Sequence, residues 1–230
     1  MCGIIGVIGE RNATPILVEG LKRLEYRGYD SAGIAVLQGE TMQLARVKGK
    51  LVHLETYLAE SPCTGPVGIG HTRWATHGPP TQENAHPHTP PRRAVVHNGN
   101  NENYQHPRHM LQEEGVVFQS ATDTEVVPHL IERALQQGLT AADAVRAAVR
   151  QLEGAFALGI LICGVANMLF AVRRGSPLLI GLGEGENFIA SDAAPLVPYT
   201  RRMVFLQDND LAVLRRGNVT VTDIEGQIVR

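Results

Sequence analysis

The chain has 230 residues, a hydrophobic fraction of 43% and a formal net charge of −2. Its length allows one large domain or two small ones, and its composition is typical of a globular protein with a full core. No basic stripe favours nucleic-acid binding, and no apolar stretch reaches membrane-spanning length. Three widely separated cysteines are too few for a disulfide framework, so we expect a reducing, cytoplasmic location.

The chain opens with Met1-Cys2-Gly3 and an apolar run, Ile4–Ile8, which predicts a short buried strand. If Met1 is removed, Cys2 carries both a thiol and a free α-amino group. The reference pKa of such an amine, about 7.7–8.0, lets it take up and return a proton near neutral pH. Cys2 is therefore a candidate nucleophile that carries its own base. The alternative is a small buried hydrophobic residue at the start of a chain.

Two helices and a hairpin are predicted next. Thr14 and Pro15 are expected at the N-cap and first position of a helix, because apolar residues follow at helical spacing. A loop at 27–31 then precedes a hairpin formed by residues 32–37 and 41–47. Residues 50–59 place three leucines on one face and predict a short helix.

A short strand at 67–71 runs into a polar loop that extends from residue 72 to about 93. Loops of this length without regular structure are usually functional in compact domains. The apolar run 94–96 is predicted to be a strand that ends in a turn at His97-Asn98-Gly99. The Asn98 amide and the Gly99 backbone N–H are two donors suited to an oxyanion hole. A simple Asn-Gly turn is the commoner alternative.

The second half predicts helices followed by strands. Thr122 or Asp123 is expected to cap a helix that reaches Leu135, and Thr140 with Asp143 resembles a capping box for a helix at 141–152. Strands are expected at 155–162, 168–173, 178–182, 188–190, 203–206, 211–215 and 219–222. Helices clustered before many strands favour an α+β architecture in one domain.

The segment from His71 to Gly78 contains the only tryptophan of the chain. Arg73 offers a planar guanidinium suited to a carboxylate, and Trp74 is a candidate cover for a pocket. A surface loop with a structurally paired arginine is the alternative. The five histidines at 71, 77, 86, 88 and 97 suggest zinc, but they lack cysteine pairs and helical i,i+4 spacing. We therefore predict no metal and no cofactor.

Five motifs occur in the order found in class II glutamine amidotransferases, and the chain resembles this family over nearly its whole length. They are Met1–Gly6, Tyr26–Gly33, His71–Gly78, His97–Gly99 and Thr122–Glu125. The string from Arg27 to Gly33, with Gly181–Ser191 and Thr200–Arg202, is most similar to the glutaminase domain of glucosamine-6-phosphate synthases. The resemblance implies an N-terminal-nucleophile hydrolase fold, an αββα sandwich of two antiparallel sheets between helical layers. This domain would span residues 2–222, with 223–230 as a tail toward an isomerase half.

The resemblance implies hydrolysis of L-glutamine through a thioester on Cys2, with the ammonia supplied to the amination of fructose-6-phosphate. It also implies a role for each of nine residues. Cys2 is the nucleophile, Arg27 lies beside it, and Asn98 and Gly99 bind the oxyanion. Arg73 holds the α-carboxylate of the substrate and Asp123 its α-ammonium. Thr76 and His77 line the substrate site, and Trp74 belongs to a mobile lid.

Two features depart from the family pattern. Asn100-Asn101 stands where apolar residues are usual, and Pro107 is expected to break the following helix or delay its start. The sugar-phosphate isomerase half has no room in this chain. The expected partners are thus L-glutamine, this absent half and a second copy in a full-length homodimer. Two other functions stay open, the glutaminase part of a purine or asparagine amidotransferase and a catalytically silent glutamine-sensing module.

Overall fold

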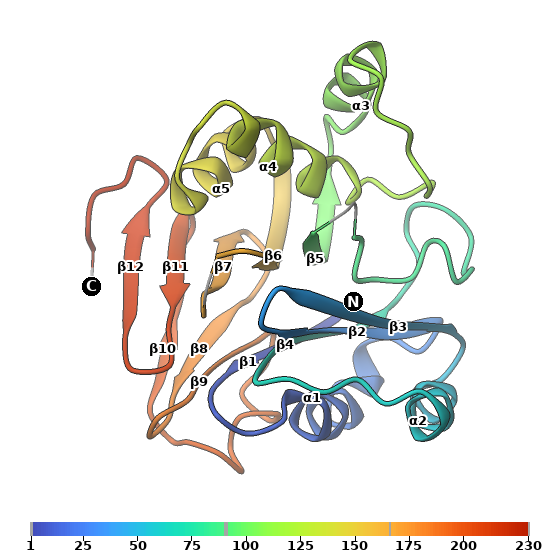
Figure 1. The fold of residues 1–230 in the computed structure, drawn as a ribbon, viewed down its shortest axis with the longest axis vertical. Helices are drawn as coiled ribbons and strands as arrows, with labels where there is room; N and C mark the ends of the chain where they lie inside the picture. The colour runs from blue at the N-terminus through green and yellow to red at the C-terminus, as the bar shows by residue number, and fades with distance from the viewer. Residues whose placement is uncertain (1, 90–91, 166, 230) are drawn as a thin grey trace.

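The computed structural model describes residues 2–89, 92–165 and 167–229 as two antiparallel sheets between helices (Figure 1). Met1, whose removal is predicted, and residues 90–91 of the predicted polar loop lie outside the described residues. The first sheet has the strand order β10-β8-β9-β1-β4-β2-β3. Its strands are β1 (Gly3–Ile8), β2 (Ser31–Gln38), β3 (Thr41–Lys48), β4 (Val67–Arg73), β8 (Leu179–Leu182), β9 (Asn187–Ala190) and β10 (Met203–Phe205).

The second sheet has the order β12-β11-β7-β6-β5. Its strands are β5 (Arg93–Asn101), β6 (Gly154–Ile162), β7 (Leu169–Arg174), β11 (Asp210–Leu214) and β12 (Val219–Asp223). Residues 223–229 turn back along β12, where the Val229 N–H donates to the Val221 carbonyl at 3.0 Å. The strands of this sheet match the predicted ones to within one or two residues, except for β5.

Helices cover the outer face of each sheet (Figure 1). Helices α1 (Ala13–Lys22) and α2 (Leu51–Glu60) pack on the first sheet, whereas α4 (Val126–Gln136) and α5 (Ala141–Val149) pack on the second. A 3-10 turn, η1 (Glu25–Arg27), follows α1, and α3 (Gln105–Glu113) follows β5. The predicted sandwich of four layers is therefore the observed one.

Strand β1 lies in the middle of the first sheet, between β4 and β9. Its side chains alternate between two apolar clusters: Ile4 and Ile8 lie between the sheets, and Ile5 and Val7 lie under α1. Each of these four side chains is at most 1% exposed, and burying one stabilises the fold by about 1.5–3 kcal/mol. The strand that follows Cys2 is thus anchored on both faces, which fixes the position of Cys2.

Two predicted helix caps are wrong. Helix α1 begins at Ala13, and the side chain of Asn12, not Thr14, accepts the hydrogen bond from the Thr14 N–H at 3.3 Å. Helix α4 begins only at Val126, after Glu125 in the N-cap position. The predicted cap Thr122 instead bonds its hydroxyl to His88 Nε2, because the segment before α4 is drawn into a buried polar network.

The turn predicted at Asn98-Gly99 is also wrong. Strand β5 continues through both residues to Asn101, since Asn98 pairs with Ala157 and Gly99 with Phe156 of β6. Pairing along a nine-residue strand overrides the local turn preference.

Pro107 neither breaks nor delays a helix. Helix α3 begins at Gln105, two residues before the proline. The missing N–H of Pro107 falls in the first turn, where backbone donors have no partner within the helix.

Candidate active site

Cys2 lies directly before β1 and beside the end of β4. Its Sγ accepts a hydrogen bond from the Trp74 N–H at 3.2 Å and donates one to the Trp74 carbonyl at 3.4 Å. Burial raises the pKa of the Cys2 thiol, and the hydrogen bond from the Trp74 backbone opposes this shift. The resting thiol therefore needs a base to become a thiolate.

Two residues of β5, Asn98 and Gly99, line the same cavity as Cys2. The Asn98 Nδ2 group donates to the Cys2 carbonyl oxygen at 2.9 Å. Gly99 has φ +127°, and a Cβ at this position would lie 2.0 Å from the Ala155 carbonyl oxygen. Only glycine fits there, because both the backbone angle and the contact with β6 exclude a side chain.

A cavity of about 480 Å³ opens in front of these groups, large enough for a small-molecule ligand. Six of the predicted site residues line it: Cys2, Arg27, Trp74, Thr76, Asn98 and Gly99. The rest of its wall is Asn100, Glu102, Ala155, Ser176 and Pro177. Sequence reasoning missed these as lining residues, because they come from separate segments that carry no motif; only Asn100 stood out, as a departure from the family pattern.

Arg27 closes one side of the cavity. Its Nε donates to the Cys2 carbonyl at 3.0 Å, and its Nη1 lies 3.6 Å from the Asp192 carboxylate. The Arg27 side chain is only 8% exposed. A buried cation with these two partners holds the backbone of Cys2 in place.

The remaining three predicted residues, Arg73, His77 and Asp123, are not among those that line this cavity. The buried Arg73 guanidinium donates to the carbonyls of His77, of Gly78 at 3.1 Å and of Pro79 at 3.3 Å. Burial lowers the pKa of Arg73, and the nearby charges of Cys2, Asp30 and Asp123 oppose that shift. In this structure Arg73 therefore braces the loop that follows Trp74.

Asp123 joins this loop to β5. Its Oδ2 accepts from the Asn101 N–H at 2.8 Å, and its Oδ1 lies 3.8 Å from His77 Nδ1. Asn101, one of the two departures from the family pattern, is 1% exposed. Its backbone thus positions the carboxylate that was predicted to bind the substrate ammonium.

Four buried histidines, 71, 86, 88 and 97, form a polar layer behind Asn98. His86 Nε2 and His97 Nδ1 both contact the Thr124 hydroxyl, at 2.9 and 2.8 Å. Burial lowers the pKa of His71 and of His88 to about 3, so both rings are neutral near pH 7. Among the described residues, no group of three or more His, Cys, Asp and Glu side chains is arranged to hold a metal ion.

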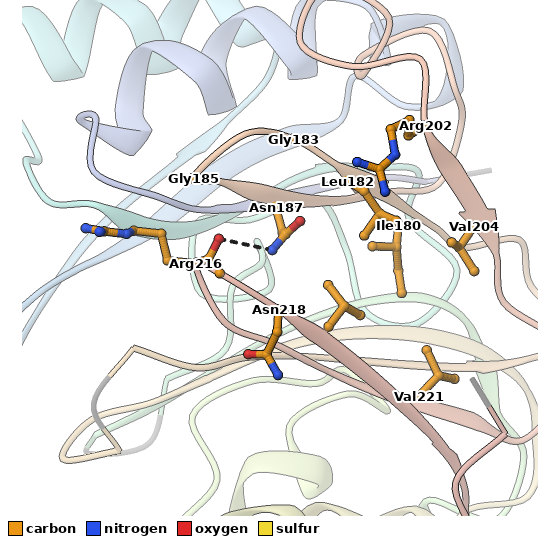
Figure 2. A pocket seen from close by; sticks show the side chains of 12 residues that line it. Ile180, Leu182, Gly183, Gly185, Asn187, Arg202, Val204, Arg216, Asn218 and Val221 are labelled. Carbon is orange, nitrogen blue, oxygen red and sulfur yellow. Dashed lines mark hydrogen bonds between the residues drawn. The ribbon is translucent and has the colours of Figure 1, made fainter.

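A second cavity, of about 340 Å³, opens between the outer edges of the two sheets (Figure 2). Figure 2 shows side chains of β8 and β10, such as Ile180 and Val204, facing Val221 of β12 across it. Its lining contains no thiol, hydroxyl, imidazole or carboxylate, and it shares no residue with the Cys2 cavity. This second cavity therefore lacks the side chains needed for nucleophilic or acid–base chemistry.

Residues 71–197 match the model of the glutamine amidotransferase domain. A glutamine–fructose-6-phosphate aminotransferase (isomerizing) of Mesorhizobium japonicum is 48% identical over 229 residues, which is 100% of this chain and 38% of that protein. An enzyme of the same name from Brucella abortus is 53% identical over 223 residues, 97% of this chain and 37% of that protein. The chain thus spans less than two-fifths of the length of these relatives.

Among solved structures, glutamine phosphoribosylpyrophosphate amidotransferase from B. subtilis superposes with a TM-score of 0.85 at 26% identity. The match covers 99% of this chain and 50% of that one. The predicted N-terminal-nucleophile amidotransferase fold is thereby confirmed. None of the helices in the described part of the chain is long and apolar enough to cross a membrane. With its family model matched over more than half its length, the chain belongs to the glutamine amidotransferase domain family.

Proposed function

We propose that this chain hydrolyses L-glutamine to L-glutamate and ammonia, with Cys2 as the nucleophile. The observation that carries the proposal is one cavity in which the Cys2 thiol, the Asn98 amide and Gly99 meet. A thiol beside two potential oxyanion donors is the arrangement that acyl transfer requires. The membership of the chain in the glutamine amidotransferase family indicates that the substrate is glutamine.

The base in this proposal is the α-amine that Cys2 gains when Met1 is removed. Burial keeps the proton on the thiol, so a base must accept it as the sulfur attacks. Among the described residues, no imidazole nitrogen hydrogen-bonds the Cys2 sulfur, whose partners are the backbone atoms of Trp74. An amine with a reference pKa of about 7.7–8.0 on the same residue suits this role.

The reaction then proceeds in two halves. The thiol gives its proton to the α-amine while the sulfur attacks the side-chain amide carbon of glutamine. The carbonyl electrons move to the oxygen, and Asn98 Nδ2 and the Gly99 N–H donate hydrogen bonds to the resulting oxyanion. The protonated amine gives its proton to the amide nitrogen, ammonia leaves, and a glutamyl thioester remains on Cys2. Water loses a proton to the amine and attacks the thioester, which releases glutamate and restores the thiol.

The charges around the cavity are proposed to select the amino-acid end of glutamine. Arg73 is assigned to the α-carboxylate and Asp123 to the α-ammonium, with Thr76 and His77 beside them. Arg73 now bonds three carbonyls of the loop after Trp74. Carboxylate binding would exchange some of these bonds for a charge-assisted pair, so we propose that substrate binding reorganises this loop as a lid.

In the full-length protein, we propose that the ammonia reaches a sugar-phosphate isomerase part and aminates fructose-6-phosphate. Identities of 48% and 53% to enzymes named for that reaction support this acceptor over the purine alternative, whose solved relative is 26% identical. The thiol-lined cavity disfavours a silent module. Three unpaired cysteines are in keeping with the cytoplasm, and the homodimer stays a prediction.

The test is incubation of the chain with glutamine, with glutamate and ammonia both measured. The proposal predicts equal amounts of the two products, and none from Cys2→Ala. Glutamine left intact by a folded chain that begins at Cys2 would favour the silent module and overturn the proposal.

A further inference from the structure

His71 is a buried residue of β4 that touches the proposed oxyanion donor Asn98. Its Nε2 lies 3.1 Å from Asn98 Oδ1 and 2.8 Å from the His97 carbonyl oxygen. Its ring stacks on that of His86, with centroids 4.3 Å apart and 26° between the planes. His71 is 1% exposed and does not line the Cys2 cavity.

The contacts determine which nitrogen of His71 carries the proton. The His97 carbonyl can only accept a hydrogen bond, so Nε2 must be the donor. The other nitrogen, Nδ1, is buried and has no hydrogen-bond partner among the described residues. His71 is therefore a neutral imidazole that presents one N–H to two oxygen atoms.

The same logic determines the orientation of the Asn98 amide. Its Nδ2 group donates to the Cys2 carbonyl oxygen, which leaves Oδ1 facing the N–H of His71. An amide turned over would set two oxygen atoms against each other on the Cys2 side and two hydrogen donors against each other on the His71 side. Both ends of the amide are thus matched in one orientation only.

We propose that His71 is a positioning residue that fixes the Asn98 amide with its N–H groups toward the developing oxyanion. The inference rests on the proposed function and adds a residue to it that never touches the substrate. In the wrong orientation, Asn98 would present Oδ1 to the oxyanion and repel it. The hydrogen bond to Oδ1 also draws electrons from the amide, which strengthens Nδ2 as a donor.

The test compares His71→Leu with His88→Leu. His88 is a buried histidine of the same layer whose Nε2 bonds the Thr122 hydroxyl at 3.0 Å, and no hydrogen bond joins it to Asn98. Loss of one oxyanion donor typically lowers kcat about 10²–10³-fold. Because His71→Leu misorients that donor without removing it, we expect kcat to fall about 10–100-fold while KM changes less than about threefold. His88→Leu should keep kcat within about twofold of wild type.

Two further variants separate positioning from mere loss of structure. His71→Gln restores an N–H near the place of Nε2 and should recover most of kcat. Adding His71→Leu to the Asn98→Ala variant should lower kcat little further, because the amide that His71 positions is already gone. Equal losses of kcat in the wild-type and Asn98→Ala backgrounds, or wild-type kcat in folded His71→Leu, would overturn the inference. If His71→Leu does not fold, His71→Ala, which also lacks the N–H, and its Asn98→Ala double variant decide in the same way. An inactive wild-type chain would instead refute the proposed function.

Discussion

The buried histidine layer should make the fold sensitive to mild acid. In the unfolded chain a histidine has a pKa of about 6.5, whereas burial holds His71 and His88 at about 3. At pH values between these two pKa values, both histidines are protonated in the unfolded state but not in the folded state. The free energy of unfolding therefore falls as the pH falls. At pH 5, about 1.5 pH units below the unfolded pKa, each histidine costs about 2 kcal/mol.

His71 and His88 together should therefore remove about 4 kcal/mol of unfolding free energy between pH 7 and pH 5. Burial also lowers the pKa of His86 and His97, which adds to the loss. Domains of this kind are stable by only about 5–15 kcal/mol, so the effect is large.

The assay is urea unfolding at pH 7, 6 and 5. The slope of the unfolding free energy against urea concentration should be the same at each pH. His88→Leu serves as the matched variant. The slope of its unfolding free energy against pH should be smaller than that of the wild type, because unfolding then takes up about one proton fewer. Equal unfolding free energies at pH 7 and pH 5 in the wild type would refute the claim that these rings are buried and neutral.

Three other predictions concern the site. Cys2→Ala should abolish glutamine hydrolysis and keep the melting temperature near wild type, since a small side chain replaces another; activity near wild type would remove Cys2 as nucleophile. Arg73→Ala should raise KM at least about tenfold, because losing a buried charge-assisted contact costs about 2–5 kcal/mol. Arg46→Ala, which removes an arginine that also bonds a loop carbonyl, should leave KM unchanged. Adding fructose-6-phosphate should neither speed glutamine hydrolysis nor yield glucosamine-6-phosphate, and either result would reveal a sugar site in this chain.

The strands of the second half could be predicted from the sequence because their ends are marked locally. Turns at Gly217-Asn218 and Glu225-Gly226 separate apolar runs, and β11 and β12 begin and end within one residue of expectation. Long-range pairing could not be predicted. Pairing with β6 continues strand β5 through Asn98 and Gly99, although the local sequence favours a turn there.

The site shows the same division. Motifs indicated Cys2, Asn98 and Gly99, which line one cavity, because the proposed chemistry demands particular residue types there. The opposite wall of the cavity, such as Ala155 and Pro177, is brought in by the packing of distant strands and has no local signature. From the sequence, His71 stood out as a possible zinc ligand and as the first residue of the His71–Gly78 motif. No spacing rule indicates that its N–H bonds the Asn98 side chain.

The central claim is that an N-terminal Cys2 supplies both the thiol and the base. The most direct test is the intact mass of the protein that turns over glutamine, compared with a form in which a bulky residue inserted after Met1 prevents its removal. We predict that all activity resides in the chain that begins at Cys2 and that the blocked form is inactive although folded. Full turnover by protein that retains Met1 would contradict the terminal-amine mechanism.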